Sequence, residues 1–138
     1  MTVVYLGLGS NLGTRARNLS AARRRLRQKG VRILRQSRVI ETRPWGVTDQ
    51  PRFLNQVVKA EWDGSPRELL RAAKAVEREG GRVATRHWGP RVIDVDILLF
   101  GDERVDAPDL VIPHPRIGER DFVVRSLAEL GVKRAGRS

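Results

Sequence analysis

The sequence predicts an α+β fold: a ferredoxin-like βαββαβ antiparallel sheet with helices packed on it and an added C-terminal helix. The length of 138 residues suits one domain with a single core. Apolar, β-branched segments alternate with segments of helical spacing, and glycine or proline turns separate them. We expect a single domain over residues 1–131, followed by a frayed, basic C-terminal tail over residues 132–138.

The first strand and the first helix are predicted from the N-terminal part of the chain. The segment TVVYLGLG, residues 2–9, is apolar and β-branched, which is typical of a buried strand. A turn over residues 10–13 leads into a helix that begins near Asn18 and ends at Gly30. The buried stripe of this helix is predicted to consist of Leu19, Ala22 and Leu26.

Two strands and a loop follow. Residues 31–41 are predicted to form one strand, and residues 53–62 are predicted to form another. The intervening segment TRPWGVTDQPR, residues 42–52, contains two prolines and a glycine, which predicts a long loop.

The second helix has a strong start signal. Ser65 can cap the helix, Pro66 can occupy its first position, and Glu68 can complete a capping box. Gly80 and Gly81 are predicted to end the helix. Its buried stripe is predicted to consist of Leu69, Ala73 and Val76.

The rest of the chain is predicted to contain a second polar loop over residues 82–91 and a β-branched strand over residues 92–100. A turn and a short return segment near residues 110–112 come next. A final helix is expected over residues 117–130. The resulting order is β-α-β-β-α-β with one more helix.

The composition narrows the classes of function. The chain has 27 lysines and arginines against 16 aspartates and glutamates, a net charge of +11, and only four of the basic residues are lysines. Because arginine can bind phosphate through two parallel hydrogen bonds, nucleotides, nucleic acid or an acidic surface are the expected partners. The absence of cysteine excludes disulfides, zinc–thiolate sites and thiol catalysis. With no apolar run near the length of a membrane span and no secretory leader, we expect a cytoplasmic protein without a membrane partner, and a monomer at this size.

The segment HWGPRVIDVDILLF, residues 87–100, carries the strongest chemical signal. On a strand, Asp94 and Asp96 project from one face, about 6.6 Å apart along the backbone. The opposite, core-facing side is predicted to hold Ile93, Val95, Ile97 and Leu99. Two carboxylates on such a strand are costly unless neutralised, and Mg²⁺ held by carboxylates and substrate phosphates would neutralise them. The adjoining loop carries Arg82, Arg86 and Arg91. Arginines beside carboxylates are the arrangement that phosphoryl transfer requires.

A simpler interpretation of the two aspartates is an edge strand whose solvent face carries them by chance.

Other nucleotide-binding motifs do not match this sequence. The glycines at positions 7, 9 and 13 place the third glycine one position too late for G-x-G-x-x-G, and no P-loop sequence occurs. A tight turn or close backbone packing explains these glycines better.

Three further side chains are candidates for ligand contact. His114 lies between two prolines with arginines nearby, so a phosphate or ribose contact and a structural role both stay open. Phe53 and Asn55 share one face of their strand, where an aromatic ring and an amide could stack on and hydrogen-bond a flat heteroaromatic ring. Core packing is the alternative for Phe53.

Together these residues resemble the 6-hydroxymethyl-7,8-dihydropterin pyrophosphokinase family of folate biosynthesis. The specific motif of this family is met by His87, Gly89–Arg91, Asp94–Asp96 and Ile97–Leu98. The similarity covers about residues 2–130. It includes Tyr5–Gly13, Thr42, Asp49–Pro51, Phe53–Asn55, Glu77, Gly81–Arg82 and Ile112–Arg116.

The resemblance implies transfer of the β,γ-diphosphate of ATP to the hydroxymethyl group of the dihydropterin, with release of AMP. It implies that Asp94 and Asp96 hold two Mg²⁺ ions and act in catalysis together with Arg82, Arg91 and Trp88. The arginines would stabilise phosphate charge, and Trp88 would pack as part of a closing loop.

The resemblance also implies the substrate contacts. The implied ATP contacts are Glu77, Arg82, Arg91, Ile97, His114, Arg116 and Arg120. The implied pterin contacts are Thr42, Trp45, Phe53, Asn55 and Phe122. The two phenylalanines would sandwich the ring, and the amide would read its edge. Two loop positions depart from the family pattern: Ala84 stands where many relatives have a second arginine, and His87 stands where many have arginine.

Two other classes fit part of these observations. The +11 charge and a ferredoxin-like sheet also suit an RNA-recognition domain, but the chain has only seven aromatic residues. The two aspartates would also repel phosphate without a metal. A phosphatase of the D-x-D-x-T/V type is the second alternative, but the threonine or valine of that motif is missing and the chain is short for it. We therefore expect small-molecule substrates, ATP and the pterin, and no nucleic acid.

Overall fold

The computed structural model of the protein describes residues 1–43, 49–81 and 92–132. Within these residues the main sheet consists of β1 (Thr2–Ser10), β2 (Arg32–Gln36), β3 (Ile40–Thr42), β4 (Phe53–Trp62) and β5 (Asp94–Phe100). The strand order is β2-β4-β1-β5, β3 also pairs with β4, and every pair is antiparallel. This order follows from the βαββαβ succession, so the predicted ferredoxin-like α+β fold is confirmed.

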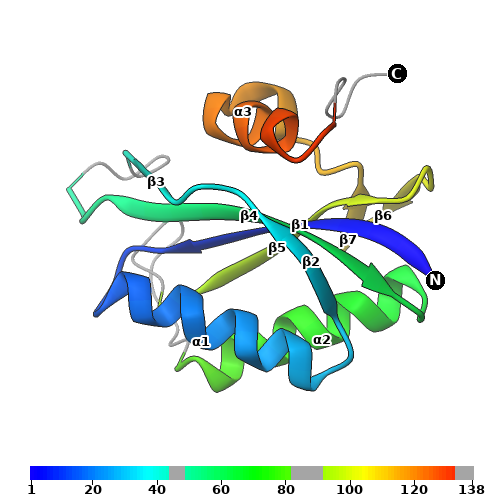
Figure 1. Ribbon diagram of the computed structural model, residues 1–138, viewed down its shortest axis with the longest axis horizontal. Coiled ribbons are helices and arrows are strands. Elements are labelled where there is room, and N and C mark those ends of the chain that lie inside the picture. The colour runs from blue at the N-terminus through cyan, green and yellow to red at the C-terminus, as the bar shows by residue number, and fades with distance from the viewer. Residues whose placement is uncertain (44–48, 82–91, 133–138) are drawn as a thin grey trace.

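The helices lie on both faces of the sheet. Helices α1 (Arg15–Gln28) and α2 (Pro66–Glu79) cover one face, and α3 (Asp121–Glu129) lies over the other (Figure 1). A large core fills the space between the sheet and the first two helices, and it includes all six predicted stripe residues. A smaller cluster beneath α3 consists of Val57, Leu98, Ile117, Val123, Leu127 and Leu130.

The start of α2 is the one that the sequence predicts. The Ser65 hydroxyl accepts a hydrogen bond from the backbone N–H of Glu68 at 3.1 Å, and the Glu68 carboxylate accepts one from the N–H of Ser65 at 2.7 Å. Pro66 occupies the first turn. The capping box is therefore present, and it satisfies two backbone donors that the helix itself leaves without a partner.

Helix α1 begins three residues earlier than predicted, at Arg15 instead of Asn18. The Asn18 amide does not cap the helix. It donates hydrogen bonds to the Leu12 carbonyl at 2.8 Å and to the Ser10 hydroxyl at 3.1 Å. Asn18, which lies in the first turn of α1, thus stabilises the turn that precedes the helix. Gly13 adopts the φ of +76° that this preceding turn requires.

The predicted strand over residues 31–41 is wrong as a continuous strand, because residues 37–39 interrupt it between β2 and β3. Gln36 pairs with Val58 and Ile40 pairs with Asn55, so three residues on this edge lie opposite two on β4. The extra residue forms a bulge, which alternation of apolar residues does not reveal.

Strand β5 begins at Asp94 rather than residue 92, and it also contains an irregularity. Tyr5 pairs with Leu99 and Leu6 pairs with Ile97, so the register shifts by one residue at Leu98. The shift reverses the alternation of faces. Ile93, Val95 and Ile97 lie in the large core as predicted. The prediction for Leu99 is wrong, because this side chain packs against the cluster beneath α3.

The C-terminal part differs in two ways from the prediction. The return segment is β7 (Leu110–Ile112), which pairs with the unexpected strand β6 (Val105–Ala107). The expected helix over residues 117–130 is divided into a 3₁₀ turn, η1 (Ile117–Glu119), and α3, because Arg120 between them is extended. Val132, predicted to begin the tail, packs against the cluster beneath α3, and the rest of the tail lies outside the described residues.

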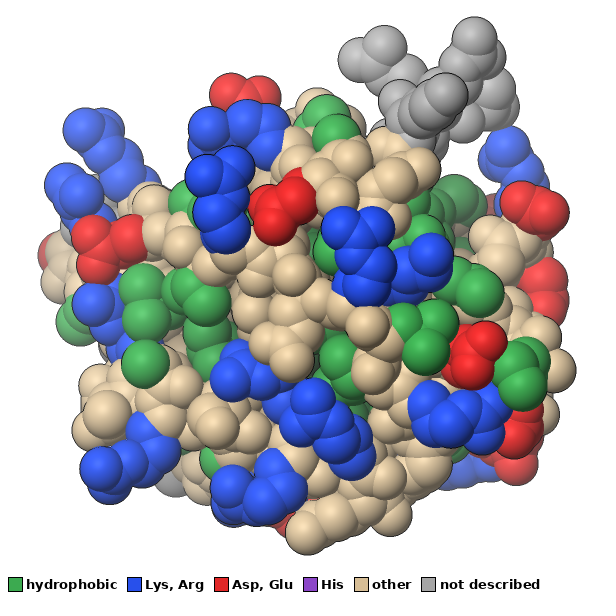
Figure 2. Space-filling model, viewed as in Figure 1, with side chains coloured by type: hydrophobic (Ala, Val, Ile, Leu, Met, Phe, Trp, Pro, Cys, Tyr) green, Lys and Arg blue, Asp and Glu red, His purple; other side chains and the backbone are tan. Residues whose placement is uncertain are grey.

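The surface is strongly basic. On the face shown in Figure 2, lysine and arginine side chains are spread widely and lie among fewer acidic ones. In the described part of the chain, no helix has the length and apolar character needed to cross a membrane.

Candidate active site

A cavity of about 940 Å³ lies between the sheet and the η1–α3 segment and reaches α2. Ten of the predicted site residues line it: Thr42, Phe53, Asn55, Glu77, Asp94, Asp96, His114, Arg116, Arg120 and Phe122. These residues come from five separate parts of the chain, from Thr42 on β3 to Phe122 on α3. The fold therefore gathers most of the predicted site into one hollow of the size that ligand sites usually have.

Two glycines of β1 form the floor of this cavity. Gly9 pairs with Asn55 on one side and with Asp94 on the other. Gly7 pairs with Asp96 in the same way. Because neither glycine carries a side chain, the surface between the aromatic side on β4 and the carboxylates on β5 stays open.

The two aspartates lie where the sequence predicts, on one face of β5 and half-buried in the cavity wall. They are suitable ligands for Mg²⁺, which prefers carboxylate oxygens. Among the described residues, no group of three or more His, Asp or Glu side chains could hold a metal by itself. A divalent cation held here would therefore also need oxygen ligands from water or from a substrate phosphate, and this is how Mg²⁺ is usually bound.

Arg120 places a positive charge beside these carboxylates. Burial lowers the pKa of its guanidinium, and the nearby negative charges of Asp96 and Asp94 offset only part of this effect. Arginine keeps its proton in proteins, so a partly buried cation faces the cavity. Such a group stabilises phosphate charge more strongly than an exposed one.

Glu77 is almost fully buried, 3% exposed, at the α2 side of the cavity. Its Oε2 accepts a hydrogen bond from the backbone N–H of Val95 at 2.9 Å, and its Oε1 lies 3.6 Å from the Nζ of Lys74. The hydrogen bond from Val95 gives a partner to a backbone N–H of the edge strand β5, and it joins α2 to β5 next to the two aspartates. Glu77 therefore has a structural role in addition to its predicted ATP contact.

The amide of Asn55 has a defined orientation. Its Nδ2 donates hydrogen bonds to the Thr42 hydroxyl and, at 3.5 Å, to the Ile40 carbonyl. A carbonyl can only accept, so the amide nitrogen must face β3. The Oδ1 consequently lies on the side of Gly9, at the floor of the cavity, where it can accept a hydrogen bond from a ligand.

The chain matches the family model of 7,8-dihydro-6-hydroxymethylpterin-pyrophosphokinase over residues 5–132. The chain belongs to this family. It is 44% identical over 131 residues to the 2-amino-4-hydroxy-6-hydroxymethyldihydropteridine pyrophosphokinase of Methylorubrum extorquens, covering 94% of this chain and 83% of that protein. The same enzyme of Aquifex aeolicus is 45% identical over 130 residues, covering 94% and 81%.

Longer relatives also match. The mitochondrial folate synthesis bifunctional protein of Pisum sativum is 45% identical over 127 residues, which are 92% of this chain and 25% of that protein. The chain thus spans about a quarter of the length of this bifunctional relative and about four fifths of the two bacterial pyrophosphokinases.

Some predicted site residues of this pyrophosphokinase family member are not brought to the cavity. Ile97 is 5% exposed and lies in the large core, so its side chain does not line the cavity. The predictions for Trp45, Arg82, Trp88 and Arg91 fall outside the described residues, as do the departures at Ala84 and His87.

Other residues that line the cavity are not among those predicted from the sequence. Asp121 and Arg125 line the cavity from the first turns of α3, and Lys74 lines it from α2. On a helix, Arg125 lies three residues after Phe122 and four after Asp121, a spacing that places Arg125 beside both of them. This signal is weak, because the helix start at Asp121 was not predicted.

His114 should titrate below the ordinary pKa of histidine. Burial lowers the pKa of its imidazole, and the positive charges of Arg120 and Arg116 lower it further. Its Nδ1 accepts a hydrogen bond from the backbone N–H of Arg116 at 3.2 Å, which favours the neutral ring. The folded state binds a proton at His114 less readily than the unfolded state does. The neutral ring therefore contributes its full stabilisation only well above the ordinary histidine pKa of about 6.5, and this stabilisation is lost as the pH falls from there through the folded pKa.

The variant His114→Asn provides the comparison, because its Oδ1 can accept the same hydrogen bond. We expect wild type to lose stability relative to this variant between about pH 7.5 and pH 5 in urea unfolding. Parallel stability curves for the two proteins would contradict the depressed pKa.

Proposed function

We propose that the protein transfers the β,γ-diphosphate of ATP to the hydroxymethyl group of 6-hydroxymethyl-7,8-dihydropterin, giving the dihydropterin diphosphate and AMP in folate biosynthesis. One observation carries this proposal. A single cavity joins an aromatic ring and a buried amide on β4, two carboxylates on β5 and arginines around η1. A flat heteroaromatic ring and a polyphosphate are the two chemistries that such a cavity accepts together.

The pterin would lie at the β3–β4 side of the cavity. Phe53 and Phe122 would stack on the two faces of the ring, and Trp45 would complete this pocket. The Asn55 Oδ1 would accept a hydrogen bond from an N–H of the pterin edge. Thr42 holds the amide in the orientation that leaves this acceptor free for the ligand.

The polyphosphate of ATP would lie over Gly7 and Gly9, between the pterin and β5. Asp94 and Asp96 would hold two Mg²⁺ ions, whose chemistry is to neutralise phosphate charge and to orient the transferred group. The remaining predicted ATP contacts that line the cavity are Glu77, His114, Arg116 and Arg120. Arg82 and Arg91 are further proposed ATP contacts.

The arginines would stabilise the charge that develops as the hydroxymethyl oxygen bonds to the β-phosphorus and the bond to AMP breaks. Residues 82–91, which the sequence predicts to form a loop, would exclude water from the activated phosphate together with Trp88. We further propose that the protein is a monomer, which its size favours, and that it acts in the cytoplasm.

The nucleotide product tests the reaction. The protein is mixed with MgATP with and without the hydroxymethyldihydropterin, and the nucleotides are separated by chromatography. AMP that forms only in the presence of the pterin is the expected result. ADP would instead indicate transfer of a single phosphate, and formation of AMP without the pterin would indicate hydrolysis of ATP.

Gly9→Ala should weaken pterin binding, because the added methyl group occupies the floor of the pterin pocket. A Cβ at this position would lie 3.1 Å from the Asn55 Oδ1 and 3.5 Å from the Phe53 ring. We expect the Kd for the pterin, measured by calorimetry, to rise by about tenfold.

Gly7→Ala is the matched control for this prediction. It makes the same chemical change on the same face of β1, but its Cβ would meet the Leu98 side chain at an ordinary 3.6 Å. We expect a change in the pterin Kd of less than about threefold. Equal effects of the two substitutions would place the pterin elsewhere in the cavity.

A further inference from the structure

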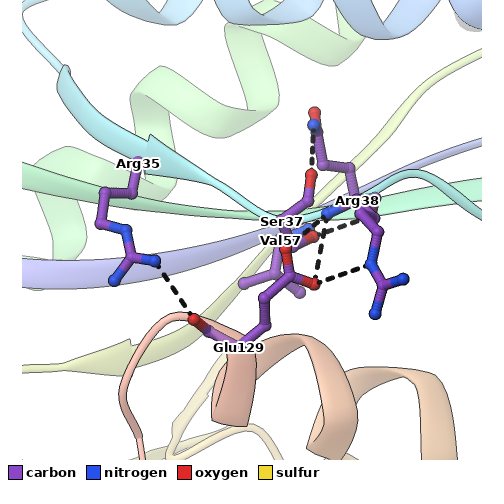
Figure 3. Close-up of polar contacts among 6 residues, drawn as sticks. Arg35, Ser37, Arg38, Val57 and Glu129 are labelled. Carbon is purple, nitrogen blue, oxygen red and sulfur yellow. Dashed lines mark hydrogen bonds and ion pairs between the residues drawn. The ribbon is translucent and has the colours of Figure 1, made fainter.

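The C-terminal end of α3 is fastened to the edge of the sheet by Glu129 (Figure 3). Its carboxylate accepts a hydrogen bond from the backbone N–H of Arg38, at 3.1 Å to Oε2 and 3.4 Å to Oε1. The Nε of Arg38 lies 3.6 Å from the same carboxylate, and Arg35 donates to the Glu129 carbonyl at 3.3 Å. The sequence separation of 91 residues makes this a tertiary contact between α3 and the segment that joins β2 and β3.

The bulge in the sheet edge makes the Arg38 N–H available. Ser37 is 4% exposed, its N–H donates to the Val57 carbonyl at 2.9 Å, and its hydroxyl accepts from the Val57 N–H at 2.9 Å. The Ser37 carbonyl accepts from the Gln56 side chain at 2.9 Å. Ser37 therefore takes up the pairing with Val57, and the next N–H along the chain turns to Glu129 on α3 (Figure 3).

An acidic residue is unfavourable at the position that Glu129 occupies. The C-terminal end of a helix carries partial negative charge and favours cations, yet the last turn of α3 contains Glu129 and no basic residue. The N–H of Arg38 and its guanidinium compensate for this. Arg38 can compensate for the unfavourable charge of Glu129 only while α3 lies at the position on the sheet edge where the two residues meet.

The opposite end of the same helix forms a wall of the cavity. Phe122, Val123 and Arg125 line it from the first two turns of α3. A helix of nine residues is about 13.5 Å long. Because the backbone hydrogen bonds of a helix join its turns, a shift of its C-terminal end would also displace its first turn. The apolar contacts of Val123 and Leu127 hold the helix on the sheet but are not directional.

We propose that Glu129 is a positioning residue of the pterin site: by binding the Arg38 N–H at the bulge, it fixes α3 against the sheet and so fixes the Phe122 ring on the cavity wall. This inference rests on the proposed pterin contact of Phe122. Glu129 itself does not line the cavity and touches no substrate in this scheme.

The test compares four variants by two measurements. Glu129→Ala removes the acceptor, Glu129→Gln keeps an acceptor oxygen but removes the charge, and Arg38→Ala removes the guanidinium but keeps the backbone N–H. Glu103→Gln, at an exposed position in the turn after β5, is the control for loss of one acidic charge. The measurements are calorimetric Kd values for the pterin and for MgATP, and amide hydrogen exchange of Arg38 and α3 in the free protein.

Glu129→Ala should raise the pterin Kd by about tenfold, and the MgATP Kd by less than about twofold. The same variant should accelerate exchange of the Arg38 amide and of the amides in α3. Glu129→Gln should have an intermediate effect. Arg38→Ala should change the pterin Kd by less than about twofold, because the Arg38 side chain is 87% exposed and an ion pair made by such a side chain contributes little.

Three results would overturn the proposal. Unchanged exchange in Glu129→Ala would show that the residue does not hold α3. Faster exchange with an unchanged pterin Kd would show that the contact has no effect on the site, and equal losses of pterin and ATP affinity would indicate general destabilisation. Phe122→Ala in the same assay tests the proposed pterin contact of Phe122 separately from the positioning role of Glu129. An unchanged pterin Kd in Phe122→Ala would show that Phe122 does not contact the pterin, and Glu129 could then not act on the pterin site through it.

Discussion

Asp96→Asn and Asp94→Asn should each lower turnover by about three orders of magnitude or more while the protein stays folded. Asparagine has nearly the shape of aspartate but lacks its charge, so it cannot neutralise the cations that accompany a polyphosphate. Both side chains line the cavity and are half-buried, and the neighbouring strand residues opposite them are glycines. Removal of either charge therefore changes the chemistry of the site without opening a void in the core.

The measurement is the rate of AMP formation at saturating substrates, together with thermal unfolding to establish that the variant is folded. Asp106→Asn is the matched control, because Asp106 is exposed on β6 and does not line the cavity. It should keep nearly full turnover. Turnover of either site variant within about tenfold of wild type would rule out the metal-binding role of that carboxylate.

Phe53→Ala should weaken pterin binding by about 100-fold and MgATP binding by less than about threefold. Phe53 is half-buried, lines the cavity and lies two residues from Asn55 on the same face of β4. The ring would supply one face of the stack on the pterin, and the polyphosphate would lie over the glycine floor on the β5 side of the pterin. Loss of the Phe53 ring should therefore lower the affinity for the pterin much more than the affinity for MgATP.

Calorimetric titration of each substrate into the variant measures this separation. Thermal unfolding of the free variant is the control, because a side chain that serves only the core would mainly lower stability. If Phe53→Ala lowers the melting temperature and leaves the pterin Kd unchanged, the residue belongs to the core and the stacking role is wrong.

Much of the fold follows from local patterns in the chain. The capping box of Ser65 and Glu68 is a contact over three residues, so it is visible in the sequence and is present in the structure. The common face of Asp94 and Asp96 likewise depends only on the two-residue period of a strand. The order of the elements and the handedness rules for sheet connections then fix the ferredoxin-like arrangement.

The errors occur where one residue is added to a strand or where a helix is interrupted. The bulge at residues 37–39 divides a predicted strand, and the register shift at Leu98 moves Leu99 to the other face. In each case the pattern of apolar residues is nearly that of a regular strand. The register is decided by pairing with β4 or β1, which residue periodicity along one strand does not specify.

The family motif, the βαββαβ order and the residue types that suit phosphate, metal and a flat ring follow from the chain alone. Which of these residues share a cavity depends on the tertiary packing. It placed Gly9 between Asn55 and Asp94, and it brought Arg38 to Glu129 across 91 residues. The physical reason is that local hydrogen bonding and side-chain period act over a few residues, whereas strand register and helix docking depend on the packing of the whole core.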